Sequence, residues 1–299
     1  MSSTAPSILD WRADGQSALV RPDGRERVAP ALVLIVLIAA AILAPVLAPG
    51  SPEAIDLTNR HAAPSLAHWF GTDDLGRDLL TRVLYGARVS LAVGLIAALV
   101  SVAVGVSVGS AAGYIGGLVE DALMRLTDAM LAVPTLPLLM IAAAIIQPSV
   151  PVLVILVGLA GWMETARVVR AEMLSFKERE FAEAARAAGA SHARIVLRHL
   201  LPNILPAAAV AGTLAVGRAI LLESALSFFG VGVQPPTASW GNMLYQAQTT
   251  MTTEPWLAVF PGLFIFVTVL SVNRLGDALS TGDGDRAARD GAGAAGEDR

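Results

Sequence analysis

The residues whose types and spacing best suit a functional role lie in a charged stretch, residues 170–203. Within it Phe181, Ala184, Ala185 and Ala188 follow one another at i, i+3, i+4 and i+7, which predicts a short helix with one narrow apolar face. A face of alanines buries little area by itself, but it lets another backbone approach closely while flanking charges set the register. The chemistry indicated is recognition of another protein. An amphipathic helix lying on lipid headgroups is the alternative.

Glu183 and Arg186 stand beside that face. Glu183 could pair with a basic residue of a partner protein, or with Arg186 in an i,i+3 pair worth a few tenths of a kcal/mol. Gly189 fits the left-handed position that ends a helix, and Ser191 fits the N-cap of a second one. The stretch therefore predicts two short helices rather than a disordered charge run.

Three further charges interrupt otherwise apolar runs: Asp128, Arg218 and Glu223. A charge inside a membrane costs at least about 2.5 kcal/mol, so such residues usually face a bundle interior or a wet pathway. Arg218 and Glu223 are five residues apart and lie on different helix faces, so we expect separate partners. For each of the three, lining a translocation pathway and packing between helices both remain open.

Asp73, Asp74, Arg77 and Asp78 form a charged cluster after the first apolar run. Their spacing predicts a short amphipathic helix over the mouth of a pore. Three carboxylates also suit calcium, but the spacing does not match an EF-hand loop, so we expect no metal. The chain has no cysteine and only four scattered histidines, which offers neither a thiol nucleophile nor a paired metal-ligand spacing.

The composition indicates how these residues are held. Hydrophobic residues make up 55% of the 299 positions and charged ones 15%, and the apolar residues come in runs of about 18 or more, the length that a bilayer core requires. Lys177 is the only lysine, and no phosphate-binding loop motif occurs. We expect an all-α membrane protein that performs no catalysis and carries no cofactor, with ATP, if used, bound by another chain. Nothing suggests a nucleic-acid partner.

The organisation we predict has six transmembrane helices. It comprises an N-terminal tail (1–28), a first span (29–48), a loop on the outer side (49–87), a core with five spans (88–275) and a disordered tail (276–299). Within the core we expect spans near 89–112, 121–147, 150–169, 204–228 and 256–272. Pro134 and Pro137 predict a kink or a break in the second of these.

The distribution of basic residues gives an orientation. With the N-terminus inside, roughly sixteen Lys and Arg fall in inner segments, four in the outer loop and one, Arg218, within a span. Both termini are therefore expected in the cytoplasm. A cleavable signal peptide is the alternative for the first apolar run, but that run is long and lacks a clear cleavage site.

Several motifs carry a resemblance to a known family. Glu183-Ala184-Ala185, three residues, Gly189 and then Leu200-Leu201-Pro202 resemble the cytoplasmic EAA loop of bacterial ABC-importer permeases. Other matching segments begin at His68-Trp69-Phe70-Gly71-Thr72-Asp73, Leu226-Ser227-Phe228-Phe229-Gly230-Val231, Ser239-Trp240-Gly241-Asn242, Phe260-Pro261-Gly262 and Asn273-Arg274-Leu275-Gly276-Asp277. The chain resembles the C-type permease of dipeptide and oligopeptide importers, whose relatives also carry nickel chelates or glutathione.

This resemblance implies the type I ABC-importer permease fold in the bacterial cytoplasmic membrane. It also implies a second homologous permease, two ATPase subunits docked on the EAA loop, and an extracytoplasmic solute-binding protein, which could meet the Asp73–Asp78 cluster. A proton-coupled secondary transporter using Asp128, Arg218 and Glu223 is the alternative, although no inverted repeat supports it. An ABC exporter is disfavoured by the EAA-type loop.

Overall fold

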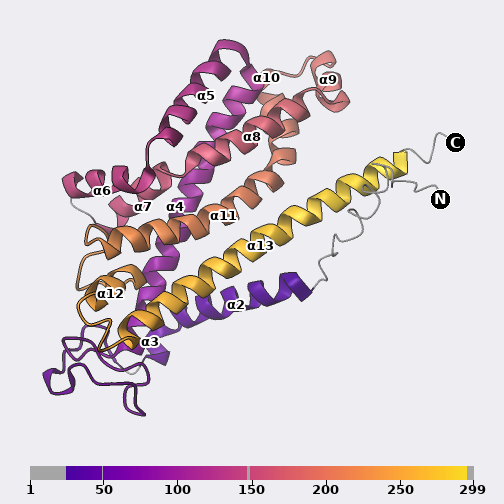
Figure 1. Ribbon diagram of the computed structural model, residues 1–299. Coiled ribbons are helices and arrows are strands. Elements are labelled where there is room, and N and C mark those ends of the chain that lie inside the picture. Colours follow the sequence, from indigo (N-terminus) through magenta and orange to yellow (C-terminus); the bar gives the residue numbers. More distant parts are fainter. Residues whose placement is uncertain (1–24, 49, 147–148, 295–299) are drawn as a thin grey trace, which may run out of the picture.

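The computed structural model describes residues 25–48, 50–146 and 149–294, and every regular element in those ranges is helical (Figure 1). Helices satisfy their own backbone hydrogen bonds, as a segment in lipid must. Three helices are long and apolar enough to cross a membrane, and the number rises to five if each of two bent helix pairs is one span. The predicted N-terminal tail up to residue 24 lies outside the described residues.

The central element is α4 (Leu79–Ile115), a helix of 37 residues, about 55 Å long. Asp78 caps its start by accepting a hydrogen bond from the backbone N–H of Thr81 at 2.8 Å. Residues 79–87, which we assigned to the outer loop, are therefore helical. The uncharged run that begins at Val89 therefore marked only part of this helix, whose first turns carry Arg82 and Arg88.

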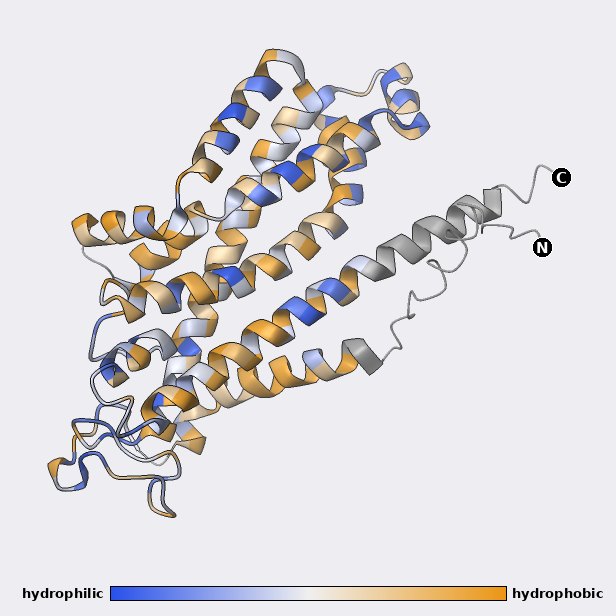
Figure 2. Cartoon of the chain, in the orientation of Figure 1, coloured by the Kyte–Doolittle hydropathy of each residue, from blue (hydrophilic) through white to orange (hydrophobic). Residues whose placement is uncertain are grey.

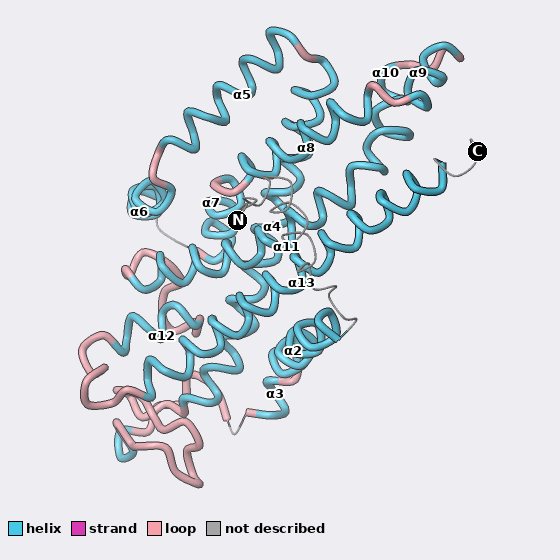
Figure 3. Tube along the Cα trace, turned by 45° about the vertical axis from the view of Figure 1, so that its right-hand side comes forward, coloured by secondary structure: helices cyan, strands magenta, loops and turns pink. Residues whose placement is uncertain are grey.

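The next span is broken at Pro134, one of the two prolines from which we predicted a kink or a break. Helices α5 (Gly117–Ala132) and α6 (Thr135–Ile146) meet at 85° around Pro134. In Figure 3 α6 lies across the end of α5, seen nearly along its axis. Proline removes a backbone donor and disfavours helical geometry in the residue before it, so the break expected from the sequence is confirmed.

A second break was not predicted. Helices α7 (Val150–Leu159) and α8 (Trp162–Lys177) are bent by 41° at Ala160 and Gly161. A Cβ atom on Gly161 would lie 2.9 Å from the Oγ atom of Ser101 on α4. The backbone at this bend thus approaches α4 more closely than a larger residue would allow.

The charged stretch contains the first of the two predicted short helices, whereas the second is continuous with the span that follows it. It holds α9 (Glu180–Ala187), then α10 (His192–Arg194) and a π-helical turn, η2 (Ile195–Leu200), which runs directly into α11 (Leu201–Phe228). The second short helix is therefore the first part of a 37-residue helix. The loop after α11 leads to α12 (Trp240–Ala247), which a capping box of Ser239 and Asn242 begins.

The remaining elements close the bundle. Helices α2 (Arg25–Ile42) and α3 (Ala44–Leu47) precede a long loop with one 3-10 turn, η1 (Leu57–Asn59). The last helix, α13 (Trp256–Ala294), continues through residues 276–294, which we predicted to be disordered. Extending an existing helix costs far less free energy than nucleating a new one. A polar segment without periodicity can therefore continue the helix of the span before it.

Close packing around α4 holds the bundle together. On α4, Gly105, Gly109 and Gly113 face α8, and a Cβ at Gly109 would come within 2.4 Å of the carbonyl oxygen of Ala166. Gly94 faces Ile220 of α11 in the same way. Small residues at helix crossings are the usual means of packing in lipid, where apolar burial alone provides no driving force between helices. Gly94, Gly105 and Gly109 thus let α8 and α11 approach α4 closely.

The molecule has two polar ends and an apolar middle. Figure 2 shows hydrophilic residues gathered on α9 at one end and in the loop before α4 at the other. Orange, hydrophobic ribbon dominates α2, α6, α7 and the first part of α13 between them. This distribution matches a protein whose middle lies in a bilayer and whose ends lie in water.

Candidate functional site

The α9 helix stands at one polar end and is anchored by few contacts. Ala182 is buried and Ala185 is half-buried against a cluster that includes Met173, Ile195 and Leu200. Phe181 is 38% exposed, and Ala184 is exposed too.

The apolar face we predicted for α9 is therefore divided. Ala185 turns toward the chain's own core together with Ala182, which lay outside the predicted face. Phe181, Ala184 and Ala188 are left uncovered. An apolar strip of one phenylalanine and two alanines thus remains accessible beside the exposed side chain of Glu183, although the Phe181 ring also contacts Phe176.

The turn after α9 has the geometry that its sequence predicts. Gly189 has a φ of +77°, and no atom lies within 4 Å of the place that a Cβ atom would occupy, so the requirement for glycine is conformational rather than steric. The Ser191 hydroxyl accepts from the backbone N–H of Arg194 at 3.4 Å, as expected of an N-cap. Arg186 donates to the carbonyl oxygen of Lys177 at 2.7 Å, which fastens α9 to the end of α8.

Arg218 has a partner that the sequence analysis missed. Its guanidinium forms an ion pair with Glu164 at the start of α8, just beyond the bend at Gly161. The two side chains are 39% and 58% exposed, and both line a cavity of about 310 Å³ together with Ser101. An acidic residue inside the run 150–169 was the signal that could have pointed to Glu164.

Glu223, five residues further along α11, is fully buried. Its carboxylate accepts hydrogen bonds from the hydroxyl of Ser227 at 2.8 Å and from that of Ser90 on α4 at 3.2 Å. Ser90 in turn accepts from the backbone N–H of Trp240, so the cluster joins α4, α11 and α12. Separate partners for Arg218 and Glu223 are as expected. The burial favours the packing interpretation of Glu223, and its pathway role stays a prediction.

Asp128 lies on α5, and its side chain is 60% exposed. It forms an ion pair with Arg167 of α8. One turn further on, Arg170 of α8 pairs with Glu120 of α5. The two pairs tie the helices together along their exposed side, and a pathway role for Asp128 also stays a prediction.

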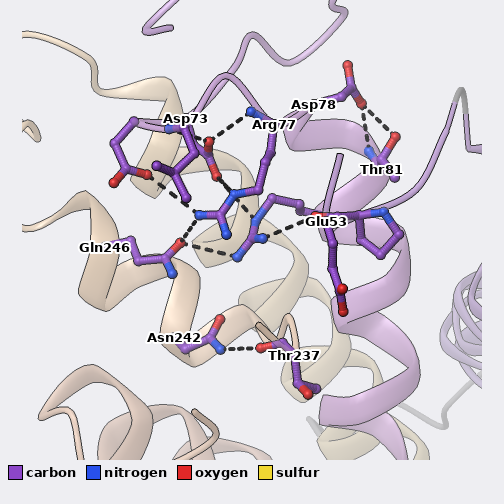
Figure 4. Close-up of polar contacts among 12 residues, drawn as sticks. Glu53, Asp73, Arg77, Asp78, Thr81, Thr237, Asn242 and Gln246 are labelled. Atoms are coloured by element: carbon purple, nitrogen blue, oxygen red, sulfur yellow. Dashed lines mark hydrogen bonds and ion pairs between the residues drawn. The ribbon is translucent and has the colours of Figure 1, made fainter. Parts of the chain in front are cut away.

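The acidic cluster before α4 is a loop rather than the short helix we predicted (Figure 4). The Asp73 carboxylate accepts from the backbone N–H groups of Leu75 and Arg77, and Gly76 has a φ of +73°. Side-chain bonds of this kind compete with helix formation, and a left-handed residue ends it. Of the cluster, Asp78 alone adjoins a helix, as the cap of α4.

The buried side of this loop is a network of charges. Arg77 donates from Nε to Asp73 at 2.7 Å, and Arg82 of α4 lies 3.4 Å from the same carboxylate. Both guanidiniums also donate to the side-chain oxygen of Gln246 on α12, at 3.4 and 3.2 Å. Asp74 is the exposed member, with a side chain that is 55% accessible. The network fixes the outer loop to α12 and leaves Asp74 facing solvent.

Two further contacts fix the same loop. His61 Nδ1 lies 2.7 Å from a carboxylate oxygen of Glu254, which precedes α13. Asp56 caps η1, and hydrogen bonds from the Thr58 hydroxyl and then the Asn59 amide hold the pKa of its carboxyl below the usual range. A segment of this length with so many internal contacts is a structured surface at the mouth of the bundle.

Fold and site together define a class. A bundle of membrane-spanning helices carries a short helix with an open face at one polar end, a structured loop at the other, and an exposed ion pair beside a cavity between them. No group of metal-ligating side chains occurs within the residues that the structure describes. These are the features of a membrane transport subunit that works through protein contacts.

Residues 105–282 match the family of binding-protein-dependent transport system inner membrane components, and the chain belongs to that family. It is 40% identical over 248 residues to a dipeptide transport system permease protein of Alkalihalophilus pseudofirmus, covering 83% of this chain and 82% of the relative. It is 42% identical over 250 residues to a glutathione transport system permease protein of Escherichia coli, with the same coverage of each.

A solved structure shares the fold. An inward-facing conformation of the methionine ABC transporter MetNI superposes with a TM-score of 0.52 at 18% identity, covering 67% of this chain and 97% of that one. The family match and the two permease relatives make the chain a multi-pass inner-membrane permease subunit of an ABC importer. The ATPase and the binding protein of such a system are separate chains.

Proposed function

We propose that this permease subunit carries dipeptides, or peptides of the size of glutathione, across the cytoplasmic membrane. The observation that carries the proposal is the identity of 40% and 42% with a dipeptide and a glutathione permease over more than four fifths of the chain. The Arg218–Glu164 pair is compatible with this substrate class, because a cation and an anion at one cavity can both interact with a zwitterionic peptide.

We further propose that the working unit contains a second, homologous permease subunit, and that the pathway runs between the two. Arg218 lies within the apolar helix α11 and Glu164 at the start of α8, and both side chains are partly exposed when this chain is taken alone. Lipid is a poor environment for such a pair. A partner permease that encloses a water-filled pathway would allow both charges to be hydrated.

In this proposal two ATPase subunits bind the assembly, one of them on α9. The uncovered side chains of Phe181, Ala184 and Ala188 would enter a groove of the ATPase, and Glu183 would pair with a basic residue there. Ala185, Arg186 and Gly189 hold the helix in position. Closure of the ATPase dimer would move α9 and, through η2, the start of α11 that follows it without interruption.

The topology we propose has six spans with both termini in the cytoplasm. The two bent pairs and the three long helices supply five spans, and α2 is an apolar helix over residues 28–42 that supplies the sixth. The loop of residues 50–78 then faces outward, where the solute-binding protein would meet the exposed Asp74 and its neighbours.

The test is transport by the assembled complex in proteoliposomes. We expect uptake of a labelled dipeptide, or of glutathione, that needs ATP and the binding protein and is unaffected by a proton gradient. Uptake driven by a proton gradient with this chain alone would overturn the proposal in favour of a secondary transporter. If uptake of another solute needed ATP and neither peptide competed with it, the assignment as an importer would stand. The proposed peptide substrate would then be wrong.

A further inference from the structure

A groove of about 680 Å³ opens on the side of the bundle between α2, α4, α11 and α13. Its walls are apolar, with exposed Leu95 and Leu99 on α4 facing Ile38 and Ile42 of α2. The hydroxyl of Thr213, one of the few polar groups in the wall, already donates to the carbonyl oxygen of Ala209. Figures 1 and 3 both place α2 at the edge of the bundle, so the groove lies at the periphery.

One charged side chain, Arg88, lines the groove. It is exposed, and its guanidinium carbon lies 5.8 Å from the centre of the Tyr85 ring. Every ion pair found among the described residues involves other side chains, so Arg88 has no carboxylate partner there. A cation at the end of an apolar groove needs an anion that this part of the chain does not supply.

The position of Arg88 along α4 fits a lipid headgroup. It is the last charge before an uncharged run that extends from Val89 to Val119, so it marks the boundary of the hydrocarbon layer on the side of the 50–78 loop. From Arg88 the lining residues continue along α4 to Val102, a distance of about 21 Å at the helical rise. One leaflet of a bilayer core is about 15 Å thick, so the apolar wall is long enough for an acyl chain.

We propose that this groove is a binding site for an anionic phospholipid, whose phosphate sits on Arg88 and whose acyl chain lies between α2 and α4. The positive charge of Arg88 favours an anionic phospholipid over a zwitterionic one. A guanidinium donates well-directed hydrogen bonds to a phosphate, and a net negative headgroup adds attraction that a zwitterionic one lacks. The lipid would fill the groove beside the contacts that α2 makes with α4 and α13, and so add to what holds the first helix in place. This site is independent of the peptide specificity proposed above.

The test is native mass spectrometry of the assembled transporter after delipidation and addition of phosphatidylglycerol or phosphatidylcholine. We expect one tightly held phosphatidylglycerol for each copy of this chain, in preference to phosphatidylcholine. Arg88→Gln should weaken phosphatidylglycerol retention about tenfold, since a charge-assisted contact is lost. Ala92→Trp, at an exposed groove position, should abolish retention by filling the space.

Two matched controls lie outside the groove: Arg125→Gln removes an exposed positive charge on α5, and Ala144→Trp enlarges an exposed alanine on α6. Both should retain the lipid as the unchanged protein does. Retention that Arg88→Gln and Ala92→Trp leave unaltered would overturn the proposal.

The chain has no cysteine, so Leu99→Cys gives a unique handle inside the groove. We expect it to be labelled by a lipid-soluble maleimide and to be protected by added phosphatidylglycerol. Cross-linking of this cysteine to the second permease subunit through a short bifunctional reagent would instead show that a protein covers the groove, and the lipid site would be wrong.

Discussion

At the scale of single residues, the charges within the helices fall into two kinds. Glu223 is enclosed by hydroxyl groups and has no exposed surface, whereas Arg218 and Glu164 keep part of their surface open beside a cavity. Burial with complete hydrogen bonding suits a structural role, because removing one partner leaves the others unsatisfied. Partial exposure within an apolar bundle suits contact with something outside the chain.

We expect charge reversal at either member of the Arg218–Glu164 pair to reduce ATP-driven uptake by about tenfold or more, since two like charges would then face each other across the cavity. The double variant Arg218→Glu with Glu164→Arg should recover part of the loss. Arg167→Gln, which breaks the exposed Asp128 pair, serves as the control and should have a smaller effect. A double variant no better than either single one would contradict a direct pair.

For Glu223 we expect a loss of stability. Glu223→Leu removes the acceptor of the Ser90 and Ser227 hydroxyls and should lower the unfolding free energy by about 1–3 kcal/mol, seen as a lower melting midpoint of the purified complex. Glu223→Gln keeps an acceptor oxygen and should cost less. If Glu223→Gln melted like the unchanged protein but transported nothing, the carboxylate would belong to the pathway instead.

At the scale of elements, α9 is a helix of 8 residues held by Ala182, Ala185 and the bond from Arg186 to Lys177. Such a short helix is marginal by itself, so its orientation depends on the turn at Gly189 and on its few contacts with the core. That arrangement leaves Phe181, Ala184 and Ala188 accessible to a partner, while the turn at Gly189 links the helix to α11 through η2.

Glu183→Lys should prevent the ATPase from co-purifying with the permease and should reduce uptake at least about tenfold, because the charge at the docking face is reversed. The amount of permease in the membrane should not change. Glu178→Lys makes the same charge change at an exposed position two residues before α9 and is the control. Equal losses for both variants would indicate a general effect of charge rather than a docking contact.

Gly189→Asp tests the turn. A side chain at a φ of +77° costs roughly 1 kcal/mol, although Asp tolerates this region better than most residues. We expect reduced ATPase binding with normal insertion, measured by pull-down and by membrane content. Gly189→Asn should be milder, since Asn is the residue other than glycine most often found there. Loss of the protein from the membrane would instead assign Gly189 a folding role.

At the scale of the whole molecule, the two polar ends should face opposite compartments. Leu66 is 97% exposed in the loop before α4, and Leu118 is 87% exposed at the start of α5, at the end of the bundle that carries α9 (Figure 1). With Leu66→Cys, an impermeant maleimide should label intact cells, whereas with Leu118→Cys it should label only permeabilised ones. The absence of native cysteine makes each label unique. The opposite pattern would invert the proposed topology.

The sequence by itself determined the features that depend on local chemistry. Runs of apolar residues predicted the membrane helices, Pro134 the break before α6, and Gly189 and Ser191 the turn between α9 and α10. Each follows from a preference of the residue's own backbone or of its immediate neighbours, so no knowledge of the fold was needed. The permease family was indicated by the resemblance of the motif around Glu183 to a known one, and not by local chemistry.

What only the tertiary structure decided were the contacts between residues far apart in the chain. The pairing of Arg218 with Glu164, the contact of Glu223 with Ser90, and the ion pairs of Asp73 with two arginines all depend on how the helices pack. One sequence leaves the relative rotation of its helices undetermined, because many rotations bury apolar surface about equally well in lipid. Small residues such as Gly109 and Gly161 select among them, and only the packed structure shows which surfaces they bring together.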